Sequence, residues 1–74
     1  MTYIYITFKT TNDALDFEEQ LKGLLPFWLV PVPRELSHNC GIAARFTEDV
    51  PEEEIRQAIR EKELSIDGFH KVTR

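Results

Sequence analysis

The residues most capable of chemistry in this chain lie together in the segment 31–41, which reads Pro-Val-Pro-Arg-Glu-Leu-Ser-His-Asn-Cys-Gly. This segment holds Cys40, the single cysteine of the chain. A thiol reacts as its thiolate, and nearby positive charge with partial exposure favours that form. Arg34 and His38 can both be cationic, and Gly41 leaves room beside the sulfur. The segment therefore predicts a presented, nucleophilic thiol, and the candidate site residues are Cys40, Arg34, Ser37, His38 and Gly41.

Each of these residues also has an interpretation without function. Free cysteine is among the most buried residue types and often packs as a small hydrophobic group. Arg34 can be a solvated loop residue paired with Glu35, and His38 can simply be exposed. Ser37 can close a turn through its hydroxyl, or donate a hydrogen bond to an anion near the sulfur. Activation of the Cys40 thiol depends on a short distance to a cation, which the fold must supply.

A metal centre and a hydrolase both fit these residues poorly. Cys40, His38 and His70 are the only cysteine and histidine side chains, and the paired cysteines of structural zinc sites are missing. A Cys–His pair with His38 or His70 would also need an orienting group and an oxyanion site within a cleft. We therefore expect no metal and no cofactor. Enzymatic activity stays open, but a role other than catalysis is favoured.

Length and composition indicate one domain that covers residues 1–74. The chain has 74 residues, 42% of them hydrophobic and 30% charged, as in ordinary globular proteins. A chain of this size buries only about 60% of its unfolded surface, so its core is thin and a deep pocket is not expected. The net charge of -4 argues against a nucleic-acid partner, because such binding rests largely on Lys and Arg.

Cysteine usage and hydropathy suggest a location. A single cysteine cannot close an intrachain disulfide, which argues against a disulfide-stapled secreted module. The chain does not start with a secretory signal pattern, and no apolar run approaches the roughly 20 residues of a membrane span. We therefore expect a cytoplasmic protein without a membrane partner.

Hydrophobic periodicity predicts the elements that must position the candidate site. Strands are predicted over 3–8, 27–32, 41–46 and 65–72, with apolar residues alternating over 3–8 and 41–46 and the last strand weakened or bent at Gly68. Helical spacing predicts a first helix that begins with a capping box at Thr10 and Asp13 and closes at Gly23. A second helix is expected to begin near residues 49–52, where acidic residues suit the positive end of the helix dipole.

The order strand, helix, strand, strand, helix, strand predicts a fold of the α+β class. Two such halves most simply form the ferredoxin-like βαββαβ sandwich, a four-stranded antiparallel sheet with two helices on one face. In its usual strand order the second and fourth strands lie at the edges. Pro31 and Pro33 agree with an edge position, because proline lacks the amide donor that a central strand needs.

Tyr3, Tyr5 and Trp28 could gather on the sheet face that the helices leave open. A large family of RNA-binding modules with this fold stacks bases on such aromatic side chains. The third strand, residues 41–46, lacks the basic and aromatic signature expected of that family. We interpret the three rings as partly exposed or as covering the interface of a homodimer.

Three motifs are shared with a known family of small domains. They are the strand over 3–8, the helix start Asp13-Ala14-Leu15, and Pro31-Val32-Pro33-Arg34-Glu35-Leu36-Ser37 leading to Cys40-Gly41-Ile42-Ala43. With these motifs the chain resembles the selenium/sulfur carrier-like domains from about Tyr3 to Val72. The resemblance implies that Cys40 carries the sulfur or selenium atom, and that the partners are donor and acceptor proteins for that atom.

The residues are compatible with two functions of different classes. In the first, the chain is a sulfur or selenium carrier or accessory protein whose loop cysteine accepts the atom as a persulfide or selenide. In the second, it is a non-catalytic regulatory or protein-interaction module. Arg34 and Ser37 would then hold a small anionic ligand or a partner, and Cys40 would be incidental.

Overall fold

The computed structural model describes residues 1–34, 36 and 41–73, and its elements follow the predicted order. The strands are β1 (Thr2–Thr7), β2 (Trp28–Pro31), β3 (Ile42–Thr47) and β4 (Gly68–Thr73), and the helices are α1 (Thr11–Leu21) and α2 (Glu52–Glu61). The strands pair antiparallel in the order β2-β3-β1-β4, with β2 and β4 at the edges. This arrangement confirms the predicted ferredoxin-like fold of the α+β class.

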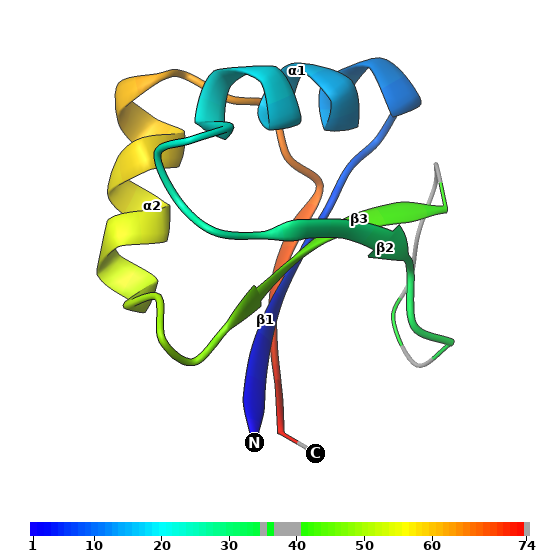
Figure 1. Cartoon of the computed structure of the whole chain (residues 1–74). Helices are drawn as coiled ribbons and strands as arrows, with labels where there is room; N and C mark the ends of the chain where they lie inside the picture. The colour runs from blue at the N-terminus through cyan, green and yellow to red at the C-terminus, as the bar shows by residue number, and fades with distance from the viewer. Residues whose placement is uncertain (35, 37–40, 74) are drawn as a thin grey trace.

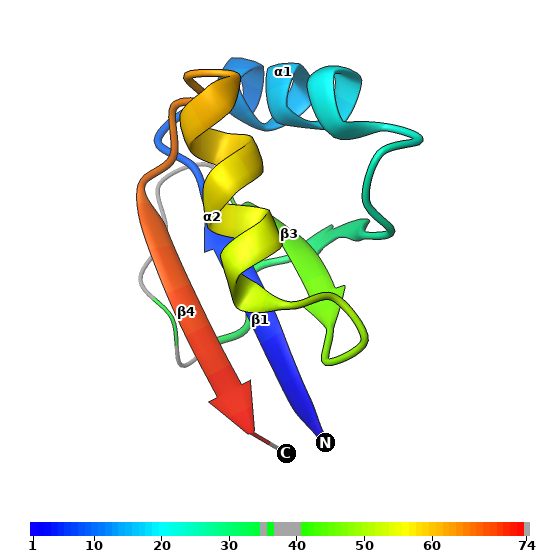
Figure 2. The ribbon, with the colours of Figure 1, turned by 90° about the vertical axis from the view of Figure 1, so that its left-hand side faces the viewer.

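Both helices pack on one face of the sheet. Figure 1 shows α1 lying across one end of the strands, whereas α2 stands beside them, and Figure 2 shows the sheet behind α2. The core lies between these layers, because alternate strand residues and one stripe of each helix point into it. Its fully buried members include Ile6, Phe8, Phe17, Leu21, Phe46 and Ile55.

Phe17 of α1 forms the centre of this core. Its ring meets the rings of Phe8, Phe27 and Phe46 edge-on, at centroid distances of 5.2, 5.4 and 6.2 Å. Edge-to-face contacts of this kind place the positive ring edge against a negative ring face, which stabilises the packing beyond the burial of area. The aromatic cluster therefore fixes α1 against the sheet.

Local signals explain where the helices begin and end. The backbone N–H of Asp13 donates to the Thr10 hydroxyl at 3.1 Å, so the predicted cap forms at the start of α1. Gly23 has a φ of +83°, the left-handed conformation predicted for the end of this helix. α2 begins after Pro51 without a side-chain cap, and Glu52–Glu54 occupy its first turn. Within the described residues, no helix is long and apolar enough to cross a membrane.

The last strand begins later than the sequence predicted. Residues 65–67 do not belong to β4, which starts at Gly68. Just before it, the N–H of Asp67 donates to the carbonyl oxygen of Thr7 at 2.7 Å. A Cβ on Gly68 would lie 2.5 Å from Nε2 of His70 and 3.0 Å from Oγ1 of Thr7. Position 68 therefore favours glycine, because the side chains of His70 and Thr7 occupy the space where a Cβ would lie.

Candidate functional site

The segment singled out by the sequence connects the edge strand β2 to β3. Its two ends are joined, because the N–H of Val32 donates to the carbonyl oxygen of Gly41 at 3.1 Å. A turn follows Pro33, whose carbonyl oxygen accepts from the N–H of Leu36 at 3.0 Å. Gly41 has a φ of +79°, and a Cβ added there would meet no described heavy atom within 4 Å. Position 41 therefore favours glycine because of its left-handed backbone conformation, and not because a side chain would lack space.

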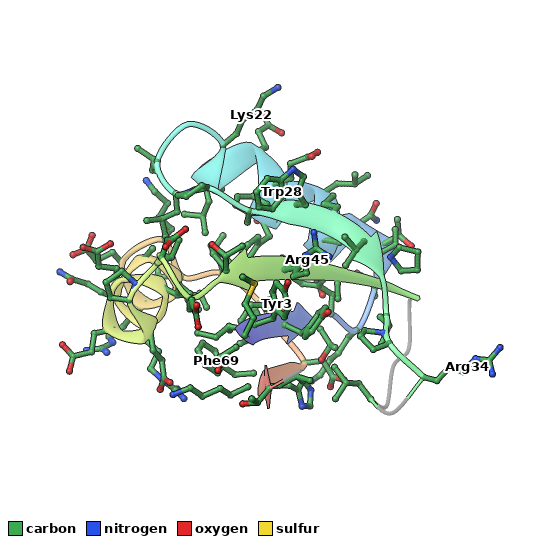
Figure 3. All side chains as sticks on the ribbon, turned by 60° about the horizontal axis from the view of Figure 1, so that its bottom comes forward. Tyr3, Lys22, Trp28, Arg34, Arg45 and Phe69 are labelled. Carbon is green, nitrogen blue, oxygen red and sulfur yellow. The ribbon has the colours of Figure 1, made fainter. Side chains whose placement is uncertain are left out.

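Arg34 is the one cationic candidate of this segment that the structure describes. Its side chain is exposed and points away from the strands (Figure 3). Cys40, Ser37 and His38 lie outside the described residues. Their grouping with Arg34 around a reactive thiol therefore stays a prediction.

A second group of candidate side chains lies on the sheet face opposite the helices. Arg45 of β3 is directly opposite Tyr5 of β1 on one side and Trp28 of β2 on the other. Figure 3 shows Trp28, Arg45 and Tyr3 following one another across the strands. The guanidinium carbon of Arg45 lies 5.4 Å from the centre of the Tyr3 ring and 5.8 Å from that of Trp28. We call Arg45, Trp28, Tyr3 and Tyr5 the Arg45 cluster.

The Arg45 cluster combines exposed aromatic surface with an incompletely bonded cation. Trp28 keeps 54% of its surface exposed, whereas Tyr5 is buried. Nε of Arg45 is buried and has no hydrogen-bond partner among the described residues. The Tyr3 hydroxyl is engaged, since it donates to the sulfur of Met1 at 3.1 Å. The cluster is therefore partly open at Trp28, and its guanidinium has an Nε donor that is unpaired among the described residues and is itself shielded from solvent.

The sign of charge on this face differs from that of the whole chain. The outward positions of the strands are Tyr3, Tyr5, Thr7, Trp28, Val30, Ala43, Arg45, Thr47, Gly68, His70 and Val72. These positions include an arginine and a histidine but no aspartate, glutamate or lysine, although the chain carries a net charge of -4. The sheet face is thus suited to a ligand or surface with negative charge.

The three aromatic residues were evident in the sequence, whereas the position of Arg45 among them was not. We interpreted the third strand as lacking a basic signature, yet its single arginine lies at the centre of the aromatic group. Strand alternation was the available signal, because Ala44 and Phe46 face the core and Arg45 must then face outward. The neighbours of Arg45 follow from strand order and register, which required the fold.

His70, considered above as a partner for the cysteine or a metal ligand, also lies on this face. Its Nε2 is 3.4 Å from the hydroxyl oxygen of Thr7, which is fully buried. Within residues 1–34, 36 and 41–73, no group of three or more His, Cys, Asp or Glu side chains could hold a metal ion. Among the described residues, His70 contacts Thr7 of the neighbouring strand β1.

A separate charged group connects α2 to β4. Oε2 of Glu52 accepts from Nε of Arg56 at 3.0 Å, and Oε1 lies 3.7 Å from Nζ of Lys71. The hydrogen bond from Arg56 is the main reason why the pKa of Glu52 is below its ordinary value, and the charges of Arg56 and Lys71 act in the same direction. The Arg56 guanidinium also lies 4.0 Å from the centre of the Phe69 ring. These contacts hold α2 to the edge of the sheet.

The comparison with protein families identifies the domain. A family model described as "Putative Se/S carrier protein-like" matches residues 3–71, nearly the whole chain. The chain belongs to this Se/S carrier-like family. Neither the comparison with curated proteins nor that with solved structures found a match. The matched range of the Se/S carrier-like domain includes both the segment 31–41 and the Arg45 cluster.

Proposed function

We propose that this Se/S carrier-like domain accepts sulfur or selenium on the thiolate of Cys40. The observation that carries the proposal is family membership over a range that includes Cys40, the single cysteine of the chain. A carrier must present a nucleophile to other proteins, and this needs no enclosed pocket. A thin domain without a deep pocket meets that need.

The proposed transfer is a thiol–persulfide exchange. The Cys40 thiolate attacks the outer sulfur of a donor persulfide, and the sulfur–sulfur bond of the donor breaks. The donor thiolate leaves with the electron pair of that bond, so no external oxidant is needed. Cys40 then holds a persulfide, which a thiolate of the acceptor can attack in the same way. A selenium atom in place of the outer sulfur follows the same course.

Two described features support this role for the connection between β2 and β3. The hydrogen bond between Val32 and Gly41 joins its ends, so the connection starts and finishes at fixed points of the sheet. Arg34, within it, offers an exposed positive charge to an anionic persulfide or thiolate.

The experiment loads the protein with inorganic polysulfide and follows the mass of the intact chain. Wild type is expected to gain the mass of a sulfur atom, and Cys40→Ser is expected to stay folded and unloaded. Iodoacetamide should alkylate Cys40 in the native protein with an apparent pKa below the ordinary thiol value of about 8.5. Normal loading of Cys40→Ser, or its unfolding, would contradict the carrier role.

A non-catalytic interaction module is the second candidate, and the exposed aromatic surface of the Arg45 cluster favours it. Arg34 and Ser37 would then hold an anionic ligand or a partner, and Cys40 would be incidental. The alkylation experiment distinguishes the two functions. An incidental cysteine reacts with iodoacetamide only after unfolding if it is buried, and with the ordinary thiol pKa of about 8.5 if it is exposed.

A further inference from the structure

Arg45 occupies an unusual electrostatic position. Its buried Nε has no described hydrogen-bond partner, and its guanidinium lies between the rings of Tyr3 and Trp28. The outward strand positions around it hold no carboxylate. A guanidinium is the side chain best suited to bind a carboxylate through two parallel hydrogen bonds. The chemistry missing from this face is therefore that of an aspartate or glutamate side chain.

The residues around Arg45 include the types that contribute most to binding energy in protein interfaces. Trp, Tyr and Arg are the residue types enriched among those that contribute most binding energy in protein interfaces, whereas Lys, Asp and Glu are depleted. The outward face contains the former and none of the latter. Trp28 supplies the exposed apolar area, with 54% of its surface open.

We propose that the Arg45 cluster docks a partner protein that presents an aspartate or glutamate beside an apolar side chain. The carboxylate pairs with the Arg45 guanidinium, and the apolar side chain packs on Trp28. The proposal rests on the carrier function, since it assigns to this face the protein that donates or accepts sulfur or selenium.

Charge decides against a second copy of the same face as the occupant. In a symmetric dimer centred on the Arg45 cluster of two such sheet faces, the two Arg45 side chains would lie near each other. The outward strand positions offer no acidic residue to compensate them. Like charges brought together without compensation oppose association.

Charge also decides against nucleic acid. A polyanion needs several Lys or Arg contacts to its phosphates, and the outward positions hold a single arginine. The net charge of -4 adds to this repulsion. One carboxylate requires one guanidinium, which is what the face provides.

The position of the cluster fits a role in transfer. Trp28 begins β2 and Pro31 ends it, and the connection that contains Cys40 leaves from Pro31. At about 3.3 Å per residue, the two ends of this strand are about 10 Å apart. A protein docked on Trp28 and Arg45 therefore lies next to the strand that leads to the carrier segment.

The test uses a positional library of acetylated hexapeptide amides, in which each pool fixes one amino acid at one position. Pools are bound to immobilised full-length protein. Pools fixed on aspartate or glutamate are expected to bind wild type most strongly, and Arg45→Met should weaken their binding about tenfold. Arg45→Lys keeps the charge but loses the planar guanidinium, so it should bind the acidic pools more weakly than wild type and more strongly than Arg45→Met. Leu24→Ala, which removes another exposed apolar side chain on the α1–β2 connection, should bind as wild type does.

Three results would overturn the proposal. The first is a lack of preference for acidic pools, or equal preference in Arg45→Met after circular dichroism has shown that this variant is folded. The second is quenching of the single tryptophan, Trp28, by a single-stranded oligoribonucleotide at a lower concentration than by the acidic pools. The third is a dimer in sedimentation that Trp28→Ala dissociates, which would make a second copy the occupant.

Failure of docking and failure of the carrier function are distinguishable. Peptide binding involves no thiol chemistry, whereas loading of Cys40 by inorganic polysulfide involves no docked protein. Acidic pools that bind a protein which cannot be loaded would support the docking site and contradict the carrier. Loading of Cys40 without any preference for acidic pools would support the carrier and contradict the docking site.

Discussion

Arg45 lies directly opposite Trp28 on the neighbouring strand, with its guanidinium carbon 5.8 Å from the centre of the indole ring. The two side chains face outward, where Trp28 is more than half exposed. A cation over an aromatic ring is attracted by the negative charge of the ring face. The pair therefore links the edge strand to its neighbour through side chains as well as through backbone hydrogen bonds.

This contact predicts an energetic coupling between Trp28 and Arg45. A double-mutant cycle with Trp28→Ala and Arg45→Met should give a coupling of about 0.5–1 kcal/mol in the free energy of unfolding, the range of exposed cation–π pairs. Urea unfolding followed by circular dichroism measures it. The same cycle with Leu24→Ala in place of Trp28→Ala should be additive, and additivity in both cycles would contradict the interaction.

Gly68→Ala should destabilise the domain by about 1–3 kcal/mol, the usual range for an overpacked site. The new methyl group would lie 2.5 Å from Nε2 of His70, which must then move away from Thr7. Urea unfolding measures the loss. In a His70→Ala background the same substitution should cost much less, and an equal loss in both backgrounds would show that the backbone of β4 is the cause.

Ile55→Ala should lower the free energy of unfolding by about 2–5 kcal/mol, because it leaves a cavity where α2 packs on the sheet. Ile55 is fully buried and belongs to the core. Leu15→Ala on α1 removes a similar side chain that is 51% exposed, and it should change stability by about 0.5 kcal/mol or less. Equal effects of the two substitutions would contradict the assignment of Ile55 to the core.

Glu52 should titrate below its ordinary pKa of 4.5 in the folded protein. Because folding lowers this pKa, the ionised carboxylate stabilises the fold at neutral pH, and the contribution is lost as the pH falls through the folded pKa. NMR titration of the Glu52 carboxyl measures it. Arg56→Met removes the main hydrogen bond and should raise the pKa of Glu52 towards its ordinary value. An unchanged pKa in this variant would contradict the assigned cause.

Arg34→Ala should leave the fold intact and slow the alkylation of Cys40 at neutral pH. The side chain is exposed, so its removal disturbs no packing, while loss of its charge raises the pKa of the thiol under the carrier hypothesis. Added salt should slow wild type in the same direction, because exposed charges are screened. Arg60→Ala on α2, which makes the same charge change at another exposed residue, should react as wild type does. Equal rates for wild type and Arg34→Ala would contradict the activation of Cys40 by Arg34.

The Se/S carrier-like family and the ferredoxin-like fold could be predicted from the sequence because both depend on local patterns. Alternation placed β1 and β3, and helical spacing placed α1 and α2. Thr10 and Gly23 marked the ends of α1 through their own backbone and side-chain preferences. The ends of the first three strands differ from the prediction by a single residue, and the largest difference is the start of β4 at Gly68 rather than at residue 65.

The Arg45 cluster shows what the sequence could not provide. Alternation alone places Arg45 on the outward face, but Tyr3, Trp28 and Arg45 are far apart along the chain. They meet because β3 pairs with β1 on one side and with β2 on the other, in a particular register. A shift of one residue in either pairing would send alternate side chains to the core. The sequence by itself determined which residues face outward and which family the chain belongs to. Only the tertiary structure decided which of those residues are neighbours, because neighbours across a sheet are set by strand order and register.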